Sequence, residues 1–303
     1  MLWASLAIIS AVLFSFVLAM DKLLLARYVP STKSFCFLVG IVQLVMAALI
    51  MILHPWSSSP TVSGVSIGLL SGIIWGLSVV TIIYGVRELE VSRVIPIAST
   101  YPVFVALIAV PVLNERFSVI QYSSILLTVL GAGLLARNGL QIAEGPIKRT
   151  NQAIYLVVLF GSVLSALAHV TYKHALTEIE FWDLFFLRSL CCFIVWSIWG
   201  LHAGLLGELR YVFGNKQVLG LFVFSECVIL PIAVTSMVAG LALGPVSIVS
   251  TLLSTRPLFV LIISGLLSTS YWNLLNEPFS KNVLPTKLLF TSMIVIGVVG
   301  VLI

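Results

Sequence analysis

Two stretches decide the fold: VSRVIPIASTYPVFVALI (residues 91–108) and VSIVSTLLSTRPLFVLII (residues 246–263). Aligned without a gap, both carry the pattern Ser-Thr-x-Pro-x-Phe-Val in the same register. The shared positions are Val91/Val246, Ser92/Ser247, Val94/Val249, Ser99/Ser254, Thr100/Thr255, Pro102/Pro257, Phe104/Phe259 and Val105/Val260. Composition bias would match scattered apolar residues but not this polar-Pro-aromatic pattern, so the two stretches predict an internal repeat.

The composition indicates a membrane protein. Of the 303 residues, 60% are hydrophobic and only 9% are charged, against about 25% charged residues in an average soluble domain. The mean hydropathy is +1.17, which makes the bilayer the natural solvent for the chain. The basic residues are scattered singly between apolar runs, so the net charge of +5 gives no nucleic-acid signal.

Apolar runs of about 20 residues, long enough to cross a bilayer as helices, recur along the whole chain. They predict spans near residues 3–21, 34–54, 64–86, 92–113, 119–136, 153–172, 184–205, 218–243, 246–268 and 284–303. The longest polar connection, at the midpoint, contains Gly, Pro and both charge signs and is typical of a linker. We therefore expect an all-α membrane protein with a first five-helix repeat at 1–138, a linker at 139–152 and a second five-helix repeat at 153–303.

An odd number of helices per repeat predicts that the second copy inserts upside down relative to the first. The placement of Lys and Arg supports this: 12 lie in the odd-numbered connections and only Arg116 and Lys173 lie in the even-numbered ones. Because basic connections stay in the cytoplasm, the charge count predicts that both termini lie outside.

The sequence resembles the EamA-type branch of the drug/metabolite transporter superfamily. The resemblance rests on EVSRVIPIASTYPVFVALIAVPVLNERFS (90–118), which is similar to the family's fourth helix and the turn after it, and on the Gly-rich VLGAGLLA (129–136). An Asn-Glu pair follows each repeated stretch, Asn114-Glu115 and Asn276-Glu277, the second displaced by an insertion. The two copies also differ where Arg256 replaces Tyr101.

The resemblance implies a secondary transporter, not an enzyme, that moves a small molecule by alternating access through a central cavity between the repeats. It implies no cofactor and no metal, a location in the bacterial cytoplasmic (inner) membrane, and partners limited to the substrate and lipid, with a homodimer left open. It also implies cytoplasmic termini, in disagreement with the charge count, which we favour for this chain. The preferred substrate is an amino acid or another organic anion or zwitterion; the alternatives are a lipophilic cationic drug, a lipid-linked flippase substrate, or an intramembrane lipid-modifying reaction.

Ionisable residues inside spans are costly and are therefore candidates for function. The sequence offers Arg256, Glu226, Arg188 and His169. Arg256 is suited to bind a substrate carboxylate or phosphate with its guanidinium fork, and Glu226 to bind an amine or carry a coupling proton. The competing interpretations are a permanent Arg256–Glu226 pair, a snorkelling or interface-paired Arg188, and a hydrogen-bonded packing role for His169.

Three aromatic residues fall in the third and fourth predicted spans, where the resemblance places the wall of the cavity. These are Trp75, Tyr84 and Tyr101. Aromatic walls suit amphipathic solutes and cations. The alternative roles are packing within the bundle and anchoring at the membrane interface.

Glycines recur at every fourth position of the third predicted span, at Gly64, Gly68, Gly72 and Gly76. Such a ladder predicts the close approach of another helix. Within it, GVSIG (64–68) matches the G-x-S-x-G pattern of serine hydrolases, but that pattern requires a strand-turn-helix elbow. We therefore interpret the match as accidental.

Overall fold

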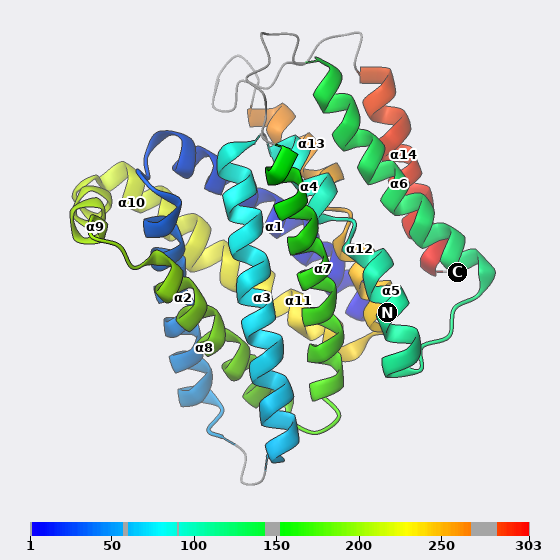
Figure 1. Cartoon of the computed structure of the whole chain (residues 1–303), viewed down its shortest axis with the longest axis horizontal. Coiled ribbons are helices and arrows are strands. Elements are labelled where there is room, and N and C mark those ends of the chain that lie inside the picture. Colours follow the sequence, from blue (N-terminus) through cyan, green and yellow to red (C-terminus); the bar gives the residue numbers. More distant parts are fainter. Residues whose placement is uncertain (1, 57–59, 90, 143–151, 268–283, 303) are drawn as a thin grey trace.

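The computed structural model describes residues 2–56, 60–89, 91–142, 152–267 and 284–302 (Figure 1). Its described part is helical and contains no strand. The helices of the first half are α1 (Leu2–Arg27), α2 (Thr32–Leu53), α3 (Val62–Glu88), α4 (Val91–Ala98), α5 (Tyr101–Leu113) and α6 (Val119–Ile142). Those of the second half are α7 (Gln152–Ala175), α8 (Phe181–Gly200), α9 (Leu205–Gly214), α10 (Lys216–Phe222), the π-helical segment η1 (Val223–Ile229), α11 (Leu230–Leu243), α12 (Val246–Leu253), α13 (Arg256–Leu267) and α14 (Leu284–Leu302).

Seven stretches of the described residues are long and apolar enough to cross a membrane: Leu2–Arg27, Thr32–Leu53, Val62–Glu88, Val94–Leu113, Ala153–Ala175, Phe181–Gly200 and Lys216–Leu243. Each corresponds to one of the ten predicted spans. The three remaining predictions fall on α6, on α12 with α13, and on α14. The sequence did not predict α9, an additional short helix between α8 and α10. The helix α6 continues to Ile142, into the predicted linker at 139–152. Residues 143–151 lie outside the described part.

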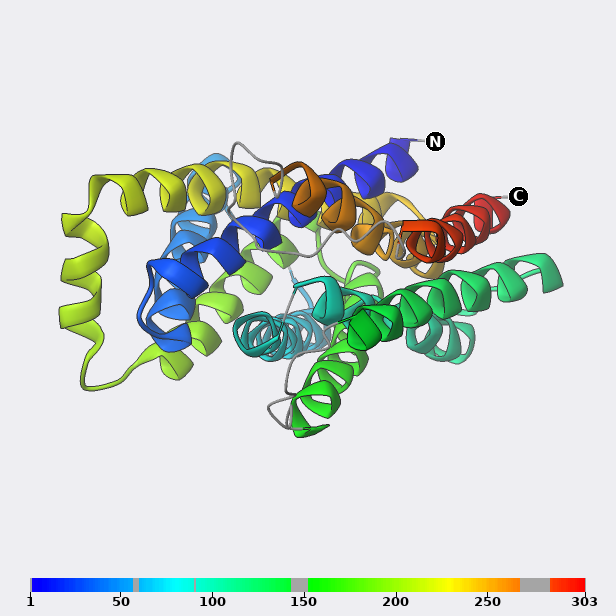
Figure 2. The ribbon, with the colours of Figure 1, turned by 90° about the horizontal axis from the view of Figure 1, so that it is seen from above.

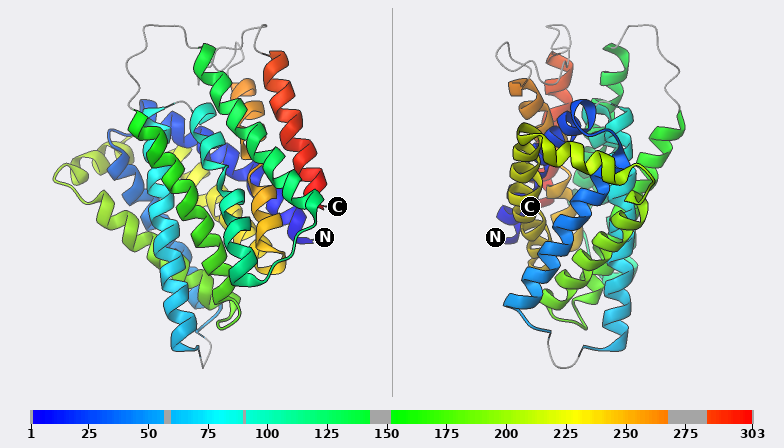
Figure 3. Two further views of the ribbon diagram at one scale, coloured as in Figure 1. Left: turned by 45° about the vertical axis from the view of Figure 1, so that its right-hand side comes forward. Right: turned by 90° about the vertical axis from the view of Figure 1, so that its left-hand side faces the viewer.

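The helices pack in cross-wise pairs from the two halves of the chain. The most extensive contacts join α3 to α7, α2 to α8, α6 to α14 and α1 to α11. Figure 2 shows α6 and α14 side by side at one end of the molecule, and Figure 3 shows α3 beside α7 in both of its views. Each half therefore packs its first helix against the third long helix of the other half.

The two repeated stretches, each predicted as one continuous span, are both interrupted. The first divides between α4 and α5 and the second between α12 and α13. At both breaks the threonine of the Ser-Thr pair turns its hydroxyl back onto the chain: Thr100 donates to the Ile97 carbonyl at 2.8 Å and Thr255 to the Leu252 carbonyl at 2.7 Å. The same local sequence thus produces the same break twice, since a hydroxyl bonded to a nearby carbonyl competes with regular helix geometry.

Two lysines make matching contacts in the two halves. The Lys22 Nζ donates to the carbonyls of Val86, Arg87 and Leu89, at 2.7, 3.2 and 2.9 Å. The Lys173 Nζ donates to the carbonyls of Leu241, Ala242 and Gly244, at 3.1, 2.8 and 3.0 Å. Each ammonium therefore satisfies the free carbonyls at the end of a helix and carries the charge that the helix dipole favours there.

The glycine ladder of α3 packs directly on α8, as predicted. A Cβ added at Gly68 would lie 2.9 Å from the Leu184 side chain, and one added at Gly72 would lie 2.7 Å from the Cys191 Cβ. The predicted helical setting of GVSIG is also confirmed, because both of its glycines lie within α3. The motif therefore lacks the strand-turn-helix elbow that a serine hydrolase needs.

Candidate functional site

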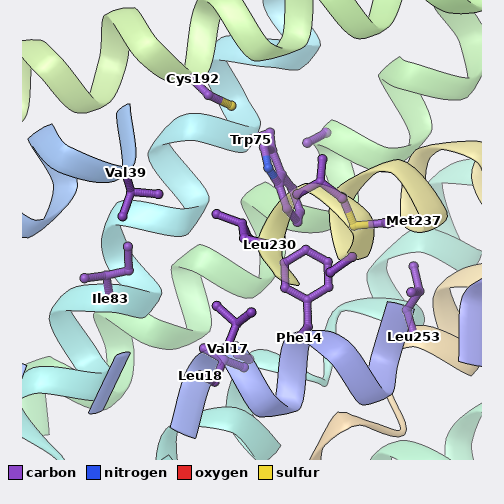
Figure 4. Packing of buried hydrophobic residues seen from close by; sticks show 14 of the residues in the cluster. Phe14, Val17, Leu18, Val39, Trp75, Ile83, Cys192, Leu230, Met237 and Leu253 are labelled. Atoms are coloured by element: carbon purple, nitrogen blue, oxygen red, sulfur yellow. The ribbon is translucent and has the colours of Figure 1, made fainter. Parts of the chain in front are cut away.

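A cavity of about 80 Å³ lies where helices of both halves meet. Since a single water needs about 10–15 Å³ of such space, the cavity has room for several waters or a small part of a solute. Most of its wall is aliphatic or aromatic, and Figure 4 shows Phe14 of α1, Trp75 of α3 and Leu230 and Met237 of α11 converging in this region. The polar side chains of the wall are those of Asp21, Gln43, Ser99, Tyr101, Ser165, His169, Glu226 and Arg256.

Arg256 is the first residue of α13, directly after the break in the second repeated stretch. Its guanidinium carbon lies 4.3 Å from the centroid of the Phe14 ring, and one terminal nitrogen contacts the Met237 sulfur at 3.8 Å. The Nε atom has no hydrogen-bond partner. Within the described residues no carboxylate forms an ion pair with this guanidinium, so its charge is free to attract an anion into the cavity.

Glu226 lies in the π-helical segment η1, followed by Pro231 in α11. Single π-helical turns inside α-helices are frequent at functional sites. The Ser225 hydroxyl donates to the Glu226 Oε1 at 2.6 Å, and the Glu226 carboxyl interacts electrostatically with the buried Asp21 carboxyl of α1. Among the described residues no ion pair joins Arg256 to Glu226, so the permanent pair considered as an alternative is not found in this structure.

His169 forms an aromatic wall with two other predicted site residues. Its ring stacks on Trp75, with centroids 5.3 Å apart, and meets Tyr101 edge to face at 5.2 Å. The Nδ1 atom lies 3.3 Å from the Ser250 hydroxyl, and the Tyr101 hydroxyl donates to the Ser250 carbonyl at 3.0 Å. The His169 Nε2 atom has no partner, so this imidazole is only half satisfied by packing.

Arg188 lies behind the cavity wall and not in it. Its guanidinium carbon is 4.4 Å from the Trp75 ring and 5.0 Å from the Tyr172 ring, and only 1% of the residue is exposed. It therefore does not snorkel to an interface. None of its three nitrogens has a hydrogen-bond partner. Arg188 supports the cavity-wall residue Trp75 by a cation–π contact.

Tyr84 does not line the cavity. It lies on α3, as Trp75 does, but 38% of it is exposed on the outer surface of the bundle. The structure thus brings Arg256, Glu226, Trp75, Tyr101 and His169 together and leaves Arg188 and Tyr84 outside. A role in substrate binding stays a prediction for all seven.

Asp21 lines the cavity but was not among the predicted site residues. The first span was predicted to end at residue 21, but α1 continues to Arg27, so Asp21 lies inside the helix and is 6% exposed. The signal in the sequence that could have revealed Asp21 is its position directly before Lys22. Because the Lys22 ammonium donates to backbone carbonyls at the end of α3, the adjacent polar residues Asp21 and Lys22 do not terminate α1.

Comparison with known proteins agrees with this architecture. Residues 1–137 match the EamA-like transporter family, which confirms the resemblance expected from the sequence. A solved crystal structure, described only as that of a protein, is similar with a TM-score of 0.62 over 96% of both chains at 14% sequence identity. At this identity the similarity concerns the fold alone. No match is found among curated proteins.

Proposed function

We propose that this chain, whose residues 1–137 match the EamA-like transporter family, is a secondary transporter that moves a small organic anion or zwitterion by alternating access. Transporters of this kind hold their substrate near the bilayer midplane between two repeats. The match of residues 1–137 supports the transporter assignment, and the described residues suggest no competing reaction. Catalysis is not part of the proposal.

We further propose ten spans in two inverted five-helix repeats. The matching lysine contacts support this arrangement, because each Nζ binds the same positions at the end of a helix in its half of the chain. The paired breaks at Thr100 and Thr255 support it as well. Interrupted helices beside a central cavity are where transporters present helix ends to a substrate.

The observation that carries the substrate class is the Arg256 guanidinium. It lies on the cavity wall at the first turn of α13, contacts the Phe14 ring and the Met237 sulfur, and is paired with no described carboxylate. An unpaired charge in a membrane interior is costly, and a bound carboxylate or phosphate would offset that cost with charge-assisted hydrogen bonds. Apolar wall residues such as Val17, Ile83 and Leu230 favour an organic group on the same solute.

A thermal-shift assay on purified protein tests this proposal. The probes are leucine, 4-methylpentanoate, isopentylamine, a hexose phosphate, adenine and tetraphenylphosphonium. A ligand at 100 times its Kd stabilises the native state by about 2.7 kcal/mol. We expect stabilisation by leucine or 4-methylpentanoate that is lost in Arg256→Gln, since a charged hydrogen bond contributes about 1.5–3 kcal/mol.

Two further variants make the result interpretable. Arg210→Gln, at an exposed position of α9, removes a positive charge far from the cavity wall and should bind as the wild type does. Arg256→Lys keeps the charge without the planar fork and should retain weakened binding even if the Gln variant is unstable. Anion binding that is equal in the wild type and both Arg256 variants would contradict the proposal.

A second candidate, export of lipophilic cations, is favoured by the aromatic and acidic side chains on the same wall. Phe14, Trp75 and Tyr101 offer ring faces, and Asp21 and Glu226 offer carboxyl groups. Stabilisation by tetraphenylphosphonium that survives in Arg256→Gln would select this function. A flippase for a lipid-linked substrate would instead leave all six soluble probes without effect.

A further inference from the structure

We propose that α9 is an amphipathic helix that lies in the membrane interface and binds anionic phospholipids through the basic side chains around it. The proposed binding surface consists of α9 and the first residue of α10. No residue of α9 lines the central cavity, so this surface is separate from the proposed transport site and does not depend on what the protein carries.

The helix α9 is too short to cross a bilayer and runs in a different direction from the long helices. It has ten residues and is therefore about 15 Å long, against a hydrocarbon core of about 30 Å. Figure 1 shows α9 nearly end-on at the edge of the molecule while α3 runs along the page, and Figure 2 shows α9 along its length. This arrangement is typical of a helix that lies along a membrane surface.

Two apolar stripes follow α9, and the protein covers only one of them. Leu205 and Val212 are seven residues apart, which places them on one face of the helix, and both are buried. Leu206 and Phe213 form the next stripe and are 72% and 56% exposed. Exposed apolar side chains on one face of a short helix insert among the upper acyl chains when the helix lies in a membrane interface.

The acid of α9 points away from the exposed stripe and is bonded to the start of α2. The Glu208 Oε2 atom accepts a hydrogen bond from the Ser31 hydroxyl at 2.6 Å and another from the Ser34 hydroxyl at 2.7 Å. The His202 Nε2 atom lies 3.4 Å from the Glu208 Oε1. These contacts fix the orientation of α9 and place the α1–α2 connection at the same end of the molecule.

Positive charge is in excess around the exposed stripe. The exposed basic residues of α9, of the start of α10 and of the α1–α2 connection are Arg27, Lys33, Arg210 and Lys216. The exposed acid described at this end is Glu88, whose neighbour Arg87 donates to the Pro30 carbonyl at 2.7 Å. This excess is complementary to an anionic lipid surface, whereas a second copy of the chain would bring the same positive charge and be repelled. Each basic residue close to an anionic surface contributes about fivefold to binding.

Thermal melting of the full-length protein in neutral detergent micelles tests the contribution of charge. The micelles are titrated with phosphatidylglycerol or with phosphatidylcholine of the same acyl chains, and we expect half-maximal stabilisation of the wild type at a lower concentration of phosphatidylglycerol. Arg210→Gln should reduce this preference about fivefold. Arg116→Gln is the matched control, since Arg116 is an exposed arginine between α5 and α6, far from α9, and it should keep the preference. A wild-type preference in Arg210→Gln, or an equal loss in both variants, would overturn the proposal.

Amide hydrogen exchange of the full-length protein in lipid nanodiscs locates the binding on the chain. We expect residues 205–214 to exchange more slowly in nanodiscs that contain phosphatidylglycerol than in nanodiscs of phosphatidylcholine alone. Phe213→Ser should speed this exchange in both lipids, because the exposed stripe inserts whatever the headgroup. Equal exchange of residues 205–214 in the two lipids would overturn the proposal, and so would slow exchange that requires a second copy in the same nanodisc, which would assign this face to a homodimer. Both measurements are made without a solute, so neither result bears on the proposed transport function.

Discussion

Adding one methyl group at Gly72 should separate two helices and disturb the cavity wall. An alanine Cβ at position 72 would lie 2.7 Å from the Cys191 Cβ and 3.1 Å from the Arg188 Cα. Carbon atoms pack at about 3.5–4.0 Å, so α3 and α8 would have to move apart by several tenths of an ångström or more. Neither contacting atom is the flexible end of a side chain, so the backbone must give.

The expected magnitude follows from two opposing terms. Overpacking of this kind costs about 1–3 kcal/mol, and replacing Gly by Ala inside a helix returns up to about 1 kcal/mol. We therefore expect Gly72→Ala to lower the free energy of unfolding by about 1–2 kcal/mol. Because Arg188 supports Trp75 at 4.4 Å, the same variant should also weaken ligand binding.

The assay is reversible unfolding in mixed detergent micelles, followed by circular dichroism. Gly133→Ala is the matched control, since a Cβ at this position of α6 meets no atom within 4 Å, and it should be neutral or stabilising by up to about 1 kcal/mol. If Gly72→Ala is as stable as the wild type, or behaves as Gly133→Ala does, the assignment of the glycine ladder to close helix packing is refuted.

The remaining predictions concern charged groups away from the cavity. Lys22→Met and Lys173→Met should each destabilise the protein by about 1.5–3 kcal/mol, because each removes an ammonium that caps a helix end. The control Lys216→Met, at an exposed position, should change the stability little. Thermal melting compares the three variants, and destabilisation by only one of the two cap variants would contradict the equivalence of the caps. Glu208 on α9 should become important only above acidic pH: burial alone raises its pKa, but hydrogen bonds from Ser31, Ser34 and His202 lower the pKa below its ordinary value of 4.5. A carboxyl whose pKa is lowered in the folded state stabilises the protein fully above its unfolded-state pKa, and this contribution is lost as the pH falls. Glu208→Gln should therefore melt at a lower temperature than the wild type at neutral pH, and the difference in melting temperature should shrink below pH 4.5. A difference in melting temperature that grows in acid would contradict the reasoning.

The sequence records the local interactions behind both the helix breaks and the glycine ladder, but only the ladder was predicted from it. The Ser-Thr pairs at 99–100 and 254–255 mark the positions where both repeated stretches break, because a threonine hydroxyl reaches a carbonyl only three residues away. The glycine ladder of α3 predicted close helix packing for the same reason: spacing by four places all its members on one face.

Other expectations failed because they depend on which face of a helix points inward. Trp75 and Tyr84 lie on the same helix, and both are aromatic residues in a fully apolar stretch. One lines the cavity and the other is 38% exposed. A span that is hydrophobic all round carries no amphipathic stripe, so nothing in the sequence distinguishes its buried side from its lipid side.

The sequence by itself determined that the chain is helical, that it has helices apolar enough to cross a membrane and that a few ionisable residues lie within apolar segments, and it predicted that the two halves are related. Only the tertiary structure decided how those residues combine: Glu226 with Asp21, Arg256 with an open cavity, and Arg188 with two aromatic rings. The physical reason is that hydrophobicity and helix breaks are properties of short segments, which the sequence records directly. Partnership between charges on α1, η1 and α13 depends on the rotation and register of helices far apart in the chain, and these are set only when the two halves pack against each other.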